Sequence, residues 1–136
     1  MANYRIDDVE GIGKTLGQRL KDAGVKDTDS LLDATSSPRG RKELAKKCGI
    51  SPERLLQFAN MVDLYRIRGV GSEYAELLEA AGVDTVPDLA RRNPANLAQK
   101  LAEVNEEKKL TRRVPPEKEV ARWIQEAKTL PKIITH

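Results

Sequence analysis

Aromatic residues, cysteine and histidine are scarce in this chain of 136 residues. Aromatics make up 4%, Cys48 is the single cysteine and His136 the single histidine. One cysteine excludes an intrachain disulfide, and the lone histidine has no cysteine or second histidine with which to build a zinc site. So few aromatics also leave little surface on which the bases of a single strand could stack. We therefore expect no metal ion.

Long apolar runs are also missing. No run approaches the ~20 residues that a membrane span requires, and the N-terminal segment lacks the apolar stretch of a secretory signal. Hydrophobic residues make up 39% and charged residues 33%, which is typical of a water-soluble helical protein with a modest core. These features predict a cytoplasmic protein without membrane contact.

Catalytic signatures are absent as well. The sequence has no interior histidine, no cysteine–histidine pair and no nucleophile elbow. Each G-x-G lacks the later glycine and the βαβ context of a nucleotide-binding fingerprint. Neighbouring acids such as Asp7 and Asp8 are ordinary solubility features. We expect no catalysis, no cofactor and no small-molecule substrate.

A glycine pattern that occurs twice dominates what is present. Residues 9–20 read VEGIGKTLGQRL, and residues 67–78 read IRGVGSEYAELL. Positions 11, 13, 20, 23, 24, 25 and 31 are each identical to the position 58 residues later. Identities at one offset and in one apolar frame predict an internal duplication. We expect two domains, residues 1–64 and residues 65–136.

Apolar spacing of three and four residues predicts helices throughout. The expected helices span residues 14–23, 28–34, 39–48, 52–65, 72–81, 86–90 and 94–104, with a last helix after Pro116. A polar loop is expected over residues 105–116. No stretch alternates long enough to predict a strand. The predicted fold class is all-α, with two tandem units of four to five short helices packed together.

The repeated pattern resembles the helix-hairpin-helix motif of DNA repair and recombination proteins. It is present at Val9, Gly11, Ile12, Gly13, Leu16, Gly17 and Leu20, and again at Ile67, Gly69, Val70, Gly71, Tyr74, Ala75 and Leu78. Residues 45–51 fit a degenerate further hairpin. Tandem copies with little else attached resemble a bacterial helix-hairpin-helix family of unknown function, which implies SAM-like helical units.

The resemblance implies that the glycine stretches touch phosphates. The implied residues are Gly11, Ile12, Gly13 and Lys14, and Gly69, Val70, Gly71 and Ser72. Glycines let a backbone approach a phosphate closely, and the N–H groups at the following helix N-terminus attract the anion. Nearby cations add candidate contacts: Arg39, Arg41, Lys42, Lys46, Lys47, Arg66 and Arg68.

The two glycine stretches differ in the charged residues that surround them. Net charge is only +3, so the case for nucleic acid depends on local patches. Glu73, Glu76 and Glu79 follow the second stretch and would oppose phosphates, which makes it the poorer candidate. The favoured hypothesis is a non-catalytic protein that binds duplex DNA through the phosphate backbone without sequence preference. The alternative is a protein–protein interaction or self-association module, including a homodimer, that uses this acidic face.

Overall fold

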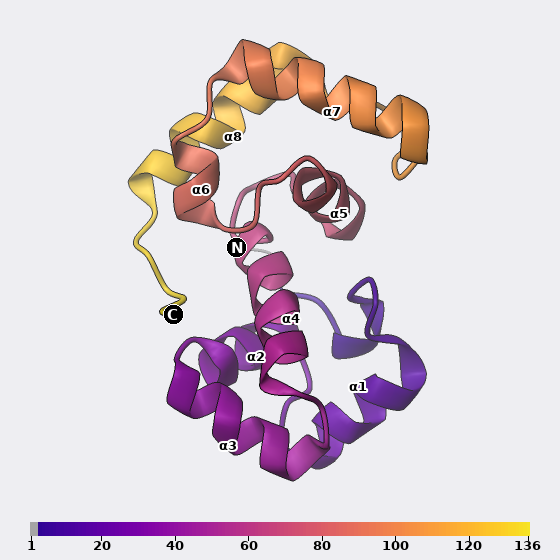
Figure 1. Ribbon diagram of the computed structural model, residues 1–136, viewed down its shortest axis with the longest axis vertical. Coiled ribbons are helices and arrows are strands. Elements are labelled where there is room, and N and C mark those ends of the chain that lie inside the picture. Colours follow the sequence, from indigo (N-terminus) through magenta and orange to yellow (C-terminus); the bar gives the residue numbers. More distant parts are fainter. Residues whose placement is uncertain (1–2) are drawn as a thin grey trace. The chain divides into compact units, whose positions relative to one another are not determined.

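The computed structural model describes residues 3–136, and over this range the regular structure is helical (Figure 1). The elements are the 3-10 helix η1 (Ile6–Asp8) and the α-helices α1 (Gly13–Asp22), α2 (Thr28–Thr35), α3 (Pro38–Cys48), α4 (Pro52–Leu64), α5 (Ser72–Ala80), α6 (Val86–Ala90), α7 (Pro94–Lys108) and α8 (Glu117–Thr129). These residues contain no strand, only an isolated bridge between Arg5 and Asp27. The predicted all-α class is confirmed. Among the described helices, none is long and apolar enough to cross a bilayer.

The chain divides into two compact units. The first, here called the N-terminal unit, comprises the described residues up to Asp63 together with Ile133–His136. The second, here called the C-terminal unit, is Leu64–Lys132. Each unit is described separately below.

Side-chain caps fix three helix starts in the N-terminal unit. The Asp27 carboxylate accepts the Ser30 backbone N–H (2.8 Å) at the start of α2, while the Ser30 hydroxyl accepts the Asp27 N–H. The Ser30 hydroxyl also donates to this carboxylate (2.7 Å), and this bond, followed by that of the Ser30 N–H, lowers the pKa of Asp27. The Ser37 hydroxyl accepts the Gly40 N–H (3.0 Å) at the start of α3, and the Ser51 hydroxyl accepts an N–H in the first turn of α4. Each cap satisfies a donor that a helix start leaves unpaired.

The end of the chain completes the N-terminal unit. The backbone N–H of Thr135 donates to the Ser36 carbonyl (2.7 Å), and Ile134 is buried. Arg41, which is 5% exposed, donates to the carbonyls of Thr35 and Thr135 at 2.8 Å each. One buried guanidinium therefore joins the end of α2 to the last residues of the chain.

The C-terminal unit packs around Trp123 on α8. Its side chain is fully buried and its ring centroid lies 5.3 Å from that of Tyr74 on α5. Helix α8 packs against α6 and α7, and Figure 1 shows α7 lying alongside it. Burial of Trp123 confirms the core position that its helical spacing predicts.

Helix α7 is longer than predicted, since it continues through residues expected to form a polar loop. The side chain of Asn105 is buried; it donates to the Thr111 carbonyl (3.0 Å) and accepts the Thr111 N–H (2.9 Å). Lys109, with a φ of 52°, ends the helix. The apolar pattern stops near Val104 because residues 106–108 are exposed, so periodicity alone ends the helix too early.

Replacing Arg41 tests its packing role. We expect Arg41→Met to lower the free energy of unfolding by about 2 kcal/mol, because the buried Thr35 carbonyl and the partly buried Thr135 carbonyl lose a charged donor. Denaturant unfolding measures this change. Lys42→Met, at the exposed neighbouring position, should change stability by no more than about 0.5 kcal/mol. Equal effects of the two substitutions would contradict the packing role.

Candidate nucleic-acid interface

The two glycine stretches begin with the same pattern of backbone hydrogen bonds. In the first, the N–H of Val9 donates to Ile6 (3.3 Å) and that of Ile12 to Val9 (3.1 Å). In the second, the bonds occur 58 residues later, from Ile67 to Leu64 (3.1 Å) and from Val70 to Ile67 (3.0 Å). We call residues 9–13 the first glycine turn and residues 67–71 the second.

A left-handed residue shapes both turns. Gly11 and Gly69 each have a φ of +89°, which a side chain rarely tolerates. The turns then diverge, because Gly13 has a φ of +67° whereas Gly71 is extended at −101°. Helix α1 accordingly begins at Gly13, and α5 begins one equivalent position later at Ser72.

The apolar residue within each turn points inward. Ile12 is 3% exposed and Val70 is 2% exposed, so these side chains anchor the turns in their units. Gly11, Gly13 and Lys14 are exposed, and apart from its chain neighbours and its own helix, no described residue has a heavy atom within 4 Å of the place a Cβ on Gly13 would occupy. The backbone of the first glycine turn is therefore open to solvent at the start of α1.

Arg54 is the residue that the sequence reasoning missed. It lies in the first turn of α4, and its guanidinium is 3.5 Å from the carbonyl oxygen of Gly11. The same group lies over the ring of Phe58, 5.4 Å from its centroid, while remaining exposed. The stacking places a cation beside the first glycine turn. No local motif marks this arginine; its relation to Gly11 arises from the packing of α4.

The basic side chains of helix α3 differ in their exposure. Arg41 is buried and bound to carbonyls, as described above, whereas Arg39, Lys42, Lys46 and Lys47 are exposed. Arg39 pairs with Glu43 (3.3 Å) at the surface. Lys42 and Lys46 line a shallow groove with Gly49, Ile50, Ser51 and Pro52.

That groove joins α3 to the start of α4. Lys46 is thus near the helix start that carries Arg54, and Arg54 in turn reaches Gly11. Lys47 instead lines a separate hollow with Gly24 and Gly40. Lys42 and Lys46 therefore lie beside the start of α4, the helix whose Arg54 approaches Gly11.

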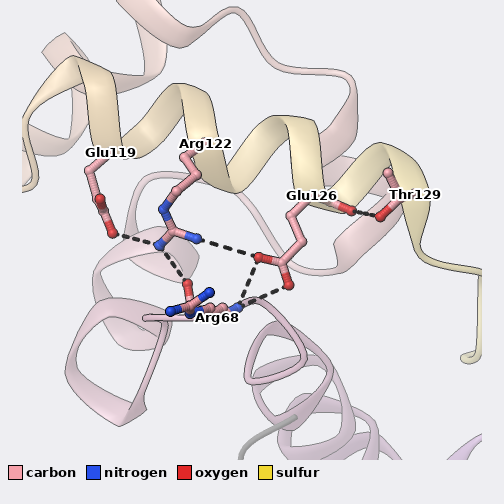
Figure 2. Close-up of polar contacts among 5 residues, drawn as sticks. All are labelled: Arg68, Glu119, Arg122, Glu126 and Thr129. Carbon is pink, nitrogen blue, oxygen red and sulfur yellow. Dashed lines mark hydrogen bonds and ion pairs between the residues drawn. The ribbon is translucent and has the colours of Figure 1, made fainter.

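Helix α8 covers one side of the second glycine turn (Figure 2). A guanidinium nitrogen of Arg122 donates to the carbonyl of Arg68 (2.8 Å), and the Glu126 carboxylate accepts the Arg68 N–H (3.1 and 3.2 Å). A Cβ added to Gly69 would lie 2.9 Å from Arg122. The backbone at Arg68 and Gly69 is therefore already in contact with the protein's own side chains.

The cations of the second stretch differ in exposure. Arg68 is exposed, whereas Arg66 is 6% exposed and donates to the carbonyl of Pro131. Ser72 is half-buried at the first position of α5. Burial gives Arg66, like Arg41, a packing role that local charge in the sequence does not reveal.

Two carboxylates surround Arg122. Glu119 lies 2.7 Å and Glu126 3.5 Å from its guanidinium. The hydrogen bond from Arg122 is the main reason that the pKa of Glu119 falls below its ordinary value of 4.5. Two negative charges therefore face the single positive charge of Arg122 next to the second glycine turn.

One known protein family matches most of the chain. Residues 10–130, most of the sequence, match the family described as a domain of unknown function, DUF4332. The chain belongs to the DUF4332 family. Searches of curated proteins and of solved structures return no match. The resemblance to bacterial helix-hairpin-helix proteins stays a prediction.

The acidic side of this DUF4332 domain lies on α5. Glu73 and Glu79 are exposed and Glu76 is half-buried. Neighbouring protein atoms displace part of the water around the Glu79 carboxylate and raise its pKa, and the nearby Asp84 and Glu76 charges raise it further. Within residues 3–136 no group of three His, Cys, Asp or Glu side chains is placed to hold a metal ion.

The Glu119–Arg122 pair should make the stability of the DUF4332 domain depend on pH. Because the folded-state pKa of Glu119 is lowered, the pair's contribution is fully present above pH 4.5 and is lost as pH falls through that lowered pKa. Glu119→Gln should cost about 0.5 kcal/mol at neutral pH, as expected for a surface pair.

Urea unfolding across pH checks this expectation, with Glu117→Gln as an exposed control on the same helix. The difference between wild type and Glu119→Gln should shrink under acidic conditions. A difference that stays constant down to the lowest pH would contradict an ion-pair contribution.

Proposed function

We propose that this protein is a non-catalytic DNA-binding protein that contacts the phosphate backbone of a duplex through its N-terminal unit. The observation that carries the proposal is the placement of Arg54 beside an open glycine turn. On this proposal the repeated turns belong to tandem helix-hairpin-helix units, and their matching hydrogen bonds at an offset of 58 residues support that interpretation.

The first glycine turn offers backbone donors to an anion. Gly13 opens α1 and is exposed, and the space where its side chain would stand is open to an approaching phosphate. The first N–H groups of a helix lack partners within the helix, and the helix dipole favours negative charge there. A backbone contact of this kind fixes the position of a duplex without identifying its bases.

Exposed cations on both sides of the turn add attraction. Lys14 follows Gly13 directly, Arg54 lies against Gly11, and Lys46 borders the groove that leads to α4. Arg39, Lys42 and Lys47 extend the basic surface along α3. Arg41 and Arg66 are omitted from the proposed interface, because both are buried and donate to backbone carbonyls.

The alternative is a protein–protein or self-association module. The exposed glutamates Glu73 and Glu79 on α5 favour it, since an acidic face complements a basic patch on another chain. The DNA hypothesis ranks first because exposed cations lie beside the exposed backbone at Gly13, where α1 begins.

A charge-reversal variant tests the proposal. Lys14→Glu/Lys46→Glu/Arg54→Glu, the N-terminal triple variant, should weaken binding to every duplex at least about tenfold at low salt. Fluorescence anisotropy across a salt series measures this loss. The log–log salt slope should fall by roughly 0.9 for each phosphate contact removed.

The matched control is Lys100→Glu/Lys108→Glu/Lys128→Glu, which changes the net charge equally at exposed positions of the C-terminal unit. This control should retain most of the binding. If both triple variants lose binding equally, the effect is one of net charge and the proposed interface is wrong. Absence of binding by the wild type even at low salt would reject the DNA hypothesis and leave the interaction module.

A further inference from the structure

The last helix of each unit presents an arginine to a glycine turn, but the two arginines have different neighbours. In the N-terminal unit, Arg54 of α4 lies by the Gly11 carbonyl and stacks on Phe58. In the C-terminal unit, Arg122 of α8 donates to the Arg68 carbonyl and is flanked by Glu119 and Glu126. The Phe58 ring carries no charge, so Arg54 keeps its full positive charge. The negative charges of Glu119 and Glu126 offset the positive charge of Arg122.

Arg122 also borders an open hollow on α8. The hollow is lined by Arg113, Pro116, Lys118, Glu119, Ala121, Arg122 and Gln125. The charge of Arg113 contributes to lowering the pKa of Glu119, which places this second arginine near the same carboxylate. Three cations therefore gather here, with Glu119 among them and Glu126 on the far side of Arg122.

We propose that Glu119 and Glu126 form an intramolecular block that keeps the basic hollow and the second glycine turn from binding a phosphate of the duplex. This inference rests on the proposed function, and it assigns the phosphate contacts to the N-terminal unit alone. The carboxylates occupy the Arg122 guanidinium and the Arg68 N–H, which are the donors that a phosphate would use there.

The charge of Glu119 contributes to the block. The pKa of Glu119 lies below its ordinary value, so this carboxylate keeps its charge. Arg122 is still 42% exposed at its side chain, so an external phosphate can reach it once the carboxylates are neutralised. Helix α8 is held independently of these residues, because its buried face consists of Val120, Trp123, Ile124 and Ala127.

Glutamine at both positions removes the charge while retaining an acceptor for the Arg68 N–H. We expect Glu119→Gln/Glu126→Gln, made in the N-terminal triple variant, to raise duplex affinity about tenfold at low salt. The salt slope should steepen by roughly 1 to 2, because one or two phosphate contacts are gained. Unchanged emission of Trp123, the single tryptophan, will show that α8 remains packed.

The matched control in the same background is Glu106→Gln/Glu107→Gln, which removes two exposed charges from α7. A gain confined to Glu119→Gln/Glu126→Gln supports the block, whereas equal gains or none overturn it. Failure of the proposed interface is seen separately, as unchanged binding of the N-terminal triple variant when Glu119 and Glu126 are intact.

Discussion

The left-handed backbone at Gly11 and Gly69 is the constraint on which both units depend. It turns the chain from a buried residue toward the helix that follows, with a φ of +89° that a residue with a Cβ rarely adopts. Ile12 and Val70 then hold the turned segment against the unit's core. Sequence identity at these positions thus follows from backbone geometry, and it says nothing by itself about which ligand the turn meets.

The difference between the units arises in the helix that approaches each turn. Arg54 and Arg122 both bring a guanidinium to a backbone carbonyl near the turn. Phe58 supports one arginine through its ring face, whereas Glu119 and Glu126 bind the other through charge. The same scaffold therefore presents an arginine that lies over an aromatic ring in one unit and an arginine that two carboxylates contact in the other. On this account, whether a unit binds phosphate depends on the side chains that contact its arginine, Arg54 or Arg122.

Much of the fold follows from the sequence, because helical spacing and the glycine and proline signals are local. The helix start at Pro52 and the burial of Trp123 are examples. The end of α7 was misplaced, since Asn105 is buried through a hydrogen bond to Thr111 that no apolar pattern records. Arg41 and Arg54 show why the candidate site could be predicted only in part from the sequence. Both are arginines at helix N-terminal positions, yet tertiary packing buries one and exposes the other beside Gly11.

The most direct test of the account is an NMR titration of the full chain with an arbitrary duplex, following backbone amide shifts. The account predicts that the largest changes fall on Gly11, Gly13, Lys14 and the first turn of α4, with Arg68 to Ser72 little affected. The same pattern should appear with a second duplex of unrelated sequence, because phosphates carry the contacts. Changes centred on the second glycine turn or on α5, with the first glycine turn unperturbed, would contradict it.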